Sequence, residues 1–285
     1  MTDSGRVQGG KPVRQALAAA AARLAGISDT PRLDAELLMA HALGVDREAL
    51  LLNGLEKDAP AEFGELLDRR LGREPVAYIT GRRAFWTIEL EVGPGVLIPR
   101  PDSETLIEAA LEGLGERGPR QVLDLGTGPG TLLLAALAQW PRARGLGVDR
   151  SERALEFARR NAERTGIGDR ARFSRGDWGF GLDRTFDLIL CNPPYVETGA
   201  ALAPEIADWE PAEALYAEGD GLAAYRRLAP DLARLLDPAG LACVEIGAGQ
   251  ERAAAGLFAA RGFTVGVRAD LAQVPRCLIL RLDRD

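Results

Sequence analysis

The segment at residues 121–131 limits the possible folds of this chain more than any other. An apolar run, V-L-D-L, occupies residues 122–125, the sequence G-T-G-P-G follows at residues 126–130, and apolar residues return at Leu132. Glycines in such a loop let a ligand approach the backbone, whose N–H groups at the start of a helix are unpaired. The segment therefore predicts a strand, a ligand-binding turn and a helix in succession.

The spacing of the glycines separates the main kinds of glycine loop. A dinucleotide-binding loop, G-x-G-x-x-G, would place a glycine where the chain has Thr131. A phosphate-binding loop needs a lysine, and the only lysines in the sequence are Lys11 and Lys57. The remaining pattern, G-x-G-x-G, resembles the S-adenosylmethionine loop of class I methyltransferases. A plain strand-to-helix turn is the alternative.

Strand-like and helix-like segments alternate through the remainder of the chain. Such alternation predicts an α/β fold, with an open and mostly parallel sheet that is covered by helices on both faces. The expected strands are residues 122–125, 145–148, 171–174, 186–191, 241–246, 264–267 and 277–282. The expected helices are residues 104–114, 132–139, 153–164, 222–236 and 252–260.

The N-terminal part has a different pattern. Residues 11–80 show helical spacing of apolar residues, around 16–24, 31–43 and 58–71, and predict a small helical bundle.

A β-hairpin is expected between the bundle and the α/β part. Apolar and polar residues alternate over 85–92, G-P-G follows, and a short apolar run occupies 96–98. The expected domains are an N-terminal helical domain at 1–81, a hairpin linker at 82–100 and an α/β domain with the methyltransferase-like loop at 101–285.

Composition excludes several functions. The chain has 285 residues, a net charge of −7 and a pI near 5.1, which argues against binding nucleic acid through a broad basic surface. No signal peptide is expected from the polar first ten residues, and no apolar stretch reaches the length of a membrane span. Cys191, Cys243 and Cys277 lie in apolar runs without a CxxC pair. We therefore expect buried thiols, no metal site and a cytoplasmic protein.

Two further strand ends carry side chains that can bind the same ligand. Asp149 ends the next expected strand, where an acidic side chain can accept hydrogen bonds from both ribose hydroxyls. A helix cap is the alternative role for Asp149. Asp177 and Trp178 follow the strand after that, so Asp177 can accept from an adenine amino group and Trp178 can cover the ring. A surface turn with a half-buried tryptophan is the alternative for this pair.

The sequence N-P-P-Y follows the expected strand at 186–191 and indicates the reaction. Two successive prolines cannot continue a central strand, so the chain must leave the sheet in a rigid loop. The Asn192 side-chain oxygen and the Pro193 carbonyl can then accept both hydrogens of a planar NH2 group. Tyr195 can lie against the face of that group, and Pro194 completes the substrate-binding loop.

This arrangement favours methylation of a planar nitrogen. The lone pair of such a nitrogen is delocalised, so the nitrogen is a poor nucleophile. Two acceptors that hold both hydrogens orient the nitrogen toward the methyl group and favour the charge-developing transition state. The sulfonium of S-adenosylmethionine is a good leaving group, so neither a metal nor a covalent enzyme intermediate is required. We therefore expect an N-methyltransferase with Asn192, Pro193 and Tyr195 as its catalytic residues.

Other segments resemble one family of these enzymes. Residues 74–81 read E-P-V-A-Y-I-T-G, F-W follows at 85–86, and residues 96–105 read V-L-I-P-R-P-D-S-E-T. Together with D-A-E-L-L-M-A-H at 34–41, E-P-A-E-A-L at 210–215 and E-I-G at 245–247, they resemble the protein-(glutamine-N5) methyltransferases of peptide chain release factors. The resemblance covers residues 30–285. The family commonly has P-E-T-E where this chain reads P-D-S-E at 101–104, and both changes keep the chemical type.

The resemblance implies a fold, a substrate and a set of site residues. The fold would be a seven-stranded, Rossmann-like sheet with its last strand antiparallel. The substrate would be the glutamine of the Gly-Gly-Gln motif in class one release factors, with the helical domain gripping the release factor and S-adenosylhomocysteine as the second product. The glutamine amide would lie against residues 192–195. The cofactor-binding residues expected from motifs and resemblance together are Gly126, Thr127, Gly128, Pro129, Gly130, Asp149, Asp177, Trp178, Asn192, Phe85, Arg100, Pro101 and Thr105.

Three alternative functions use the same core. A nucleic-acid N-methyltransferase also uses N-P-P-Y, but base flipping calls for a basic flanking surface that this acidic chain does not indicate. Ribosomal-protein glutamine methyltransferases usually lack the P-R-P of residues 99–101. An idle cofactor-binding subunit would be expected to lack Asn192 or Tyr195. The leading hypothesis is therefore a monomeric release-factor enzyme without direct nucleic-acid or membrane binding.

Some residues suggest no part in the reaction. His41 is the only histidine, and a structural or surface role is favoured for it. Arg69, Arg70 and Arg73 near a helix end could meet an acidic partner surface, but such a group is more typical of a solvated face. Glu210 matches the family pattern, and we expect it to order the loop above the site.

Overall fold

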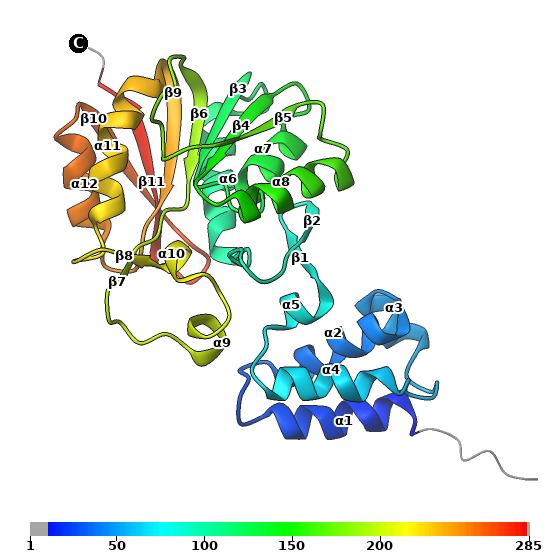
Figure 1. Ribbon diagram of the computed structural model, residues 1–285. Helices are drawn as coiled ribbons and strands as arrows, with labels where there is room; N and C mark the ends of the chain where they lie inside the picture. Colours follow the sequence, from blue (N-terminus) through cyan, green and yellow to red (C-terminus); the bar gives the residue numbers. More distant parts are fainter. Residues whose placement is uncertain (1–10, 284–285) are drawn as a thin grey trace, which may run out of the picture. The chain divides into compact units, whose positions relative to one another are not determined.

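The computed structural model describes residues 11–283, which form two compact units (Figure 1). The smaller unit contains residues 11–81 and 203–209, and the larger contains residues 82–202 and 210–283. Each unit has its own hydrophobic core. None of the helices in the described part of the chain is long and apolar enough to cross a membrane.

The smaller unit consists of short helices. Its core contains residues that recur at helical spacing, such as Leu17, Leu24 and Leu38. The unit contains α1 (Val13–Leu24), α2 (Pro31–Leu43), α3 (Arg47–Asn53), α4 (Glu62–Leu71), α5 (Val76–Thr80) and, from the returning segment, α9 (Pro204–Ala207). The sequence pattern did not reveal α3 and α5, because helices of seven and five residues are too short to show a clear period.

Paired charges lie inside this unit. Arg70 Nε donates to Asp34 Oδ2 at 2.8 Å, and the two side chains are 6% and 10% exposed. The expectation that Arg70 belongs to a solvated face is therefore wrong. A buried carboxylate needs a charged partner. The Asp34 carboxylate on α2 is buried, so the Arg70 side chain turns inward to pair with it. Arg69 is also paired, through two hydrogen bonds to the Glu74 carboxylate.

The larger unit contains the seven-stranded sheet that the resemblance predicted. The strand order is β10-β11-β9-β6-β3-β4-β5, and β11 runs antiparallel to both of its neighbours. The other pairs in the sheet are parallel. The strands are β3 (Gln121–Leu125), β4 (Arg144–Asp149), β5 (Ala171–Arg175), β6 (Phe186–Cys191), β9 (Leu236–Glu245), β10 (Phe263–Ala269) and β11 (Pro275–Leu282).

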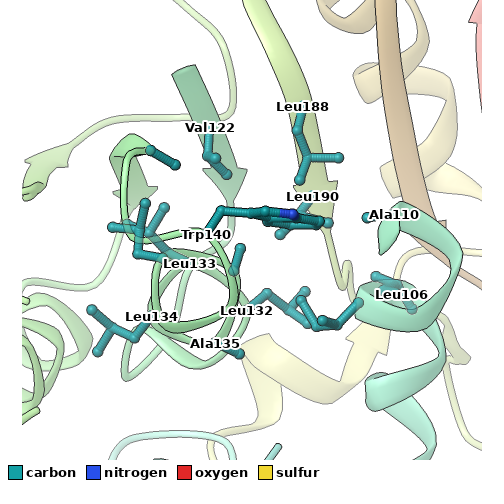
Figure 2. Packing of buried hydrophobic residues seen from close by; sticks show 14 of the residues in the cluster. Leu106, Ala110, Val122, Leu132, Leu133, Leu134, Ala135, Trp140, Leu188 and Leu190 are labelled. Carbon is teal, nitrogen blue, oxygen red and sulfur yellow. The ribbon is translucent and has the colours of Figure 1, made fainter. Parts of the chain in front are cut away.

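Helices cover both faces of the sheet, because successive strand residues point to opposite faces. In β6, Leu188 and Leu190 pack into one core with Trp140, whereas Ile189 packs into the other. Figure 2 shows the first core, in which Val122, Leu188 and Leu190 face the α6 and α7 side chains around Trp140. The helices are α6 (Glu104–Leu114), α7 (Thr131–Gln139), α8 (Glu152–Arg164), α11 (Ala223–Leu235) and α12 (Glu251–Ala259). The three cysteines are buried free thiols, as expected.

The β-hairpin differs from the expected one. Its strands are β1 (Arg82–Phe85) and β2 (Ile88–Glu91), with the turn at Trp86 and Thr87. The Trp86 backbone N–H donates to Glu104 Oε1 at 2.7 Å, which holds the turn with Trp86 at a φ of 54°.

Residues 96–98 do not form the expected second strand. The Ile98 N–H is used by the Glu210 carboxylate at 2.9 Å instead of by a neighbouring strand. The remaining short elements of the larger unit are η1 (Pro101–Ser103), α10 (Ala212–Leu215), β7 (Val196–Glu197) and β8 (Tyr216–Ala217).

Candidate active site

A cavity of about 280 Å³ lies in the larger unit, at the carboxyl ends of the parallel strands. The glycine loop after β3 forms part of its wall. Gly126, Gly128 and Gly130 all have positive φ, between 55° and 88°, which explains why glycine recurs there. The Gly126 and Thr127 N–H groups donate to the Val148 carbonyl at 2.8 and 3.0 Å, which fixes the loop to the end of β4.

The cavity brings together most of the expected binding residues. Those that line it are Gly126, Thr127, Gly128, Pro129, Asp149, Asp177, Trp178, Asn192, Pro194 and Arg100. Gly130, Pro193 and Tyr195 belong to the same loops but do not line the cavity.

Phe85, Pro101 and Thr105 also do not line the cavity. Phe85 is 1% exposed because it packs in the hydrophobic core with Leu90 and Leu132. Thr105 is buried in the first turn of α6, and Pro101 is exposed.

The end of β4 presents the Asp149 carboxylate to the glycine loop. Its Oδ2 accepts from the Gly128 N–H at 2.8 Å, and its Oδ1 accepts from the Ser151 N–H at 2.9 Å. Each carboxylate oxygen can accept more than one hydrogen bond. Asp149 can therefore hold the loop and still accept from hydroxyl groups of a ligand.

Trp178 and Asp177 have different surroundings. Trp178 has a φ of 51°, and a methyl group added at Gly126 would lie 3.4 Å from its Cζ3 atom. The indole ring therefore covers the glycine loop. The Asp177 carboxylate is more than half exposed and pairs with Arg227, so it lies at the solvent side of the cavity.

Asp124 is a site residue that the sequence analysis did not identify. It is 1% exposed and lines the cavity, and its Oδ2 accepts from Thr127 Oγ1 at 2.6 Å and from the Leu133 N–H at 3.1 Å. Its Oδ1 has no hydrogen-bond partner among the described residues. Burial raises the pKa of Asp124 to about 7, against the lowering effect of its two hydrogen bonds. The cavity thus offers a buried acceptor that an ammonium group of a ligand would satisfy.

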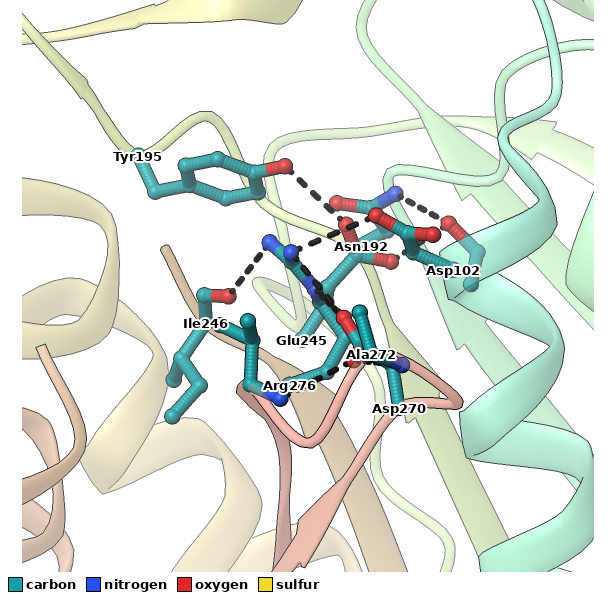
Figure 3. Close-up of polar contacts among 10 residues, drawn as sticks. Asp102, Asn192, Tyr195, Glu245, Ile246, Asp270, Ala272 and Arg276 are labelled. Atoms are coloured by element: carbon teal, nitrogen blue, oxygen red, sulfur yellow. Dashed lines mark hydrogen bonds and ion pairs between the residues drawn. The ribbon is translucent and has the colours of Figure 1, made fainter. Parts of the chain in front are cut away.

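The loop after β6 is held by a second buried carboxylate, Glu245 (Figure 3). The Asn192 Nδ2 donates to Ser103 Oγ at 3.1 Å, and Ser103 Oγ donates to Glu245 Oε2 at 2.5 Å. The Tyr195 hydroxyl donates to Glu245 Oε1 at 3.1 Å. The Gln250 side chain donates to the Tyr195 carbonyl at 3.0 Å. Two segments that are distant from the N-P-P-Y loop in the sequence, one at Ser103 and one at residues 245–250, therefore fix this loop.

Burial also dominates the electrostatics of this network. It raises the pKa of Glu245 to about 7, while the bonds from Ser103 and Tyr195 and the charge of Arg276 lower it. Burial and the Glu245 carboxylate raise the pKa of Tyr195, so its hydroxyl remains a donor. In the sequence, Ser103 and Glu245 stand out only as members of the P-D-S-E and E-I-G motifs. Nothing in their spacing indicated that they meet, since 142 positions separate them.

The roles considered for other residues can be compared with their positions. Glu210 is 6% exposed and orders the cavity wall, because its Oε1 accepts from Arg100 Nη2 at 2.5 Å. His41 is exposed on α2 in the smaller unit. Within residues 11–283, no group of three His, Cys, Asp or Glu side chains is arranged to hold a metal ion.

Known protein families match parts of both units. Residues 15–81 match the PrmC N-terminal domain, and residues 119–248 match a methyltransferase domain family. The chain is 45% identical to the release factor glutamine methyltransferase of Caulobacter vibrioides, covering 84% of this chain and 85% of that one. It is also 45% identical to the enzyme of that name from Rhodospirillum rubrum, with 91% and 81% covered.

A solved structure supports the fold alone. A methyltransferase from Pyrococcus furiosus is 20% identical with a TM-score of 0.55, and the match covers 78% of this chain and all of that one.

Proposed function

The chain belongs to the release factor glutamine methyltransferases, and we propose that it methylates the side-chain amide nitrogen of a release-factor glutamine with S-adenosylmethionine as donor. The observation that carries the proposal is the orientation of the Asn192 amide. Its nitrogen donates to Ser103 at 3.1 Å, so its oxygen is the end left for a ligand at the cavity. An amide oxygen at this position accepts a hydrogen from a substrate NH2 group.

The methyl donor would be held by residues around the glycine loop. Asp149 would accept from the ribose hydroxyls, Trp178 would cover the adenine, and the free Asp124 Oδ1 would accept from the ammonium of the methionine part. The buried, unpartnered oxygen of Asp124 fits a cationic ligand because a bound ammonium would remove the cost of burying that acceptor alone. When bound, S-adenosylmethionine supplies an electrophilic methyl group on sulfur.

The N-P-P-Y loop would bind the acceptor. Asn192 Oδ1 and the Pro193 carbonyl would accept the two amide hydrogens, and the Tyr195 ring would lie against the amide plane. Tyr195 is fixed at both ends, through its hydroxyl to Glu245 and its carbonyl to Gln250. A rigid loop orients the nitrogen without loss of conformational entropy at the moment of reaction.

The smaller unit would bind the body of the release factor. This assignment rests on the match of residues 15–81 to the PrmC N-terminal domain and on the release-factor specificity in the relatives' names. The acceptor would be the glutamine of the Gly-Gly-Gln motif, and the enzyme would act as a monomer in the cytoplasm, where release factors work.

One labelling experiment tests the function. The purified protein is incubated with methyl-labelled S-adenosylmethionine and a class one release factor, beside a release factor whose Gly-Gly-Gln glutamine is replaced by alanine. We expect label in the first and none in the second. Equal label in both would exclude that glutamine as the acceptor. If neither release factor is labelled, a ribosomal protein and RNA are offered as acceptors in turn. Label on one of them would support the corresponding alternative function.

A further inference from the structure

Glu245 acts on the site from behind. It is the last residue of β9, is 1% exposed and does not line the cavity. Both of its carboxylate oxygens nevertheless accept hydrogen bonds that support the N-P-P-Y loop (Figure 3). Oε1 accepts from Tyr195 of that loop, and Oε2 accepts from Ser103, which contacts Asn192. The carboxylate therefore cannot turn without breaking one of the two bonds.

The direction of these hydrogen bonds is determined by a count of hydrogens. An ionised carboxylate is an acceptor only, and a serine hydroxyl has one hydrogen. Because Ser103 Oγ gives its hydrogen to Glu245 at 2.5 Å, it can only accept from its other neighbour, Asn192. The end of the Asn192 amide that faces Ser103 must then be the NH2 group.

This count matters because the two ends of an asparagine amide have nearly the same shape. Packing alone does not distinguish them, and the hydrogen-bond network decides which end points where. With the NH2 group toward Ser103, the oxygen faces the cavity. With the amide turned over, an NH2 group would face the NH2 group of the substrate glutamine, and donor would meet donor.

We propose that Glu245 is a positioning residue that sets, through the Ser103 hydroxyl, which end of the Asn192 amide faces the acceptor. The inference rests on the proposed function for its consequence in catalysis. It assigns a role to Glu245, which does not line the cavity, and to Ser103, which does, and it depends on the described chain Glu245–Ser103–Asn192.

The substitution Glu245→Gln tests the direction of the relay. The glutamine oxygen can keep the Tyr195 hydroxyl bond, which turns its NH2 group toward Ser103. Ser103 then accepts from residue 245 and donates to Asn192, so the Asn192 amide turns over. We expect kcat for release-factor methylation to fall roughly a hundredfold, with KM for release factor changed much less.

Removal of the relay gives the distinguishing result. In Ser103→Ala nothing enforces either orientation, so we expect kcat to fall only roughly fivefold. In the double variant the glutamine can no longer turn Asn192 over, and kcat should rise from the Glu245→Gln value to that of Ser103→Ala. Ser103→Thr is the matched control, because it keeps the hydroxyl and should retain activity. A double variant as slow as Glu245→Gln, or slower, would overturn the proposal.

A spectroscopic measurement decides the relay without a substrate. The side-chain NH2 signal of Asn192, assigned by its absence in Asn192→Ala, is followed by ¹⁵N NMR. It should move in Glu245→Gln and stay in place in Ser103→Thr. A signal unmoved in Glu245→Gln would contradict the relay. If the wild-type enzyme transfers no labelled methyl group to release factor, that result would contradict the proposed function alone.

A pH titration serves if Glu245→Gln does not fold, because protonation of Glu245 also removes one acceptor oxygen. With a pKa of about 7 for Glu245, the Asn192 NH2 signal of the wild-type protein should titrate near neutral pH. In Ser103→Ala it should not. A signal that is flat in the wild type, or that titrates equally in both, would overturn the relay. The titratable and charged groups that face Glu245 are Tyr195, Tyr225, Arg276, Asp102, Cys191 and Cys277.

Discussion

Glu210 and Arg100 form an ion pair of 2.5 Å between segments 110 residues apart. The Glu210 side chain is buried, and its second oxygen accepts from the Ile98 N–H. Arg100 lines the cavity, so Glu210 holds that part of the wall from behind.

Glu210→Ala should therefore loosen the wall that Arg100 forms. Loss of one partner of a largely buried pair leaves the other uncompensated. We expect the Kd for S-adenosylhomocysteine to rise roughly tenfold, measured by calorimetry. Asp208→Ala is the control, since Asp208 is an exposed carboxylate nearby in the same loop. Equal affinities in the two variants would show that the pair does not shape the cavity.

Asn192→Ala should separate binding from turnover. The substitution removes the acceptor oxygen proposed for the substrate amide, and the glycine loop and Asp149 stay in place. We expect kcat to fall roughly a hundredfold or more, with the affinity for S-adenosylhomocysteine nearly unchanged. Calorimetry and single-turnover labelling measure the two quantities. An equal collapse of cofactor affinity would place Asn192 on the cofactor side instead.

Gly247→Ala should displace the Tyr195 ring. A Cβ atom at Gly247 would lie 3.0 Å from Tyr195 Cδ2 and 2.9 Å from Gln250 Oε1, which is closer than ordinary contact. We expect kcat to fall roughly tenfold. Gly256→Ala, in the exposed part of α12 with nothing within 4 Å of the added atom, should leave kcat unchanged. It should also stabilise the protein by about 1 kcal/mol through helix propensity. Loss of activity in both variants would show that the close contact at Gly247 is not the cause of the loss.

Asp124→Asn should change how stability depends on pH. The pKa of Asp124 is raised in the folded protein, from 3.8 to about 7, so the folded state binds its proton more tightly. Its contribution to stability is full below about pH 4 and is lost as pH rises through 7. The variant should flatten this part of the Tm profile and melt higher than wild type at pH 8. The cofactor Kd should rise with the loss of the charge. An unchanged profile would mean that Asp124 is not the group responsible.

Arg70→Ala should weaken the helical unit alone. It leaves the buried Asp34 carboxylate without its main partner, which costs about 3 kcal/mol or more. We expect the KM for release factor to rise and the Kd for S-adenosylhomocysteine to stay constant. Arg14→Ala removes an exposed pair with Glu56 and should change neither value. Unchanged KM in Arg70→Ala, despite a lower melting temperature of that unit, would argue against its role in substrate binding.

Sequence patterns predicted the core of the larger unit well, and the reason is physical. Buried parallel strands are continuous apolar runs, and the covering helices show a clear period, so β6 and α6 were located from pattern alone. The hairpin was harder. Alternation over residues 85–92 gave one long strand, but the Glu104 carboxylate captures the Trp86 N–H and places a turn inside it.

The fold class follows from the alternation of strand-like and helix-like segments along the chain. The glycine loop and the N-P-P-Y loop can also be located from the sequence, because each depends on backbone conformations that glycine permits or proline enforces within a few residues. The tertiary structure decided what supports these loops. Glu245 acts on Asn192 through Ser103, and Glu210 acts on Arg100. The two residues in each of these contacts are more than 80 positions apart in the sequence. A buried carboxylate shows its function only by the donors that the fold brings to it, and no spacing in the chain records those partners.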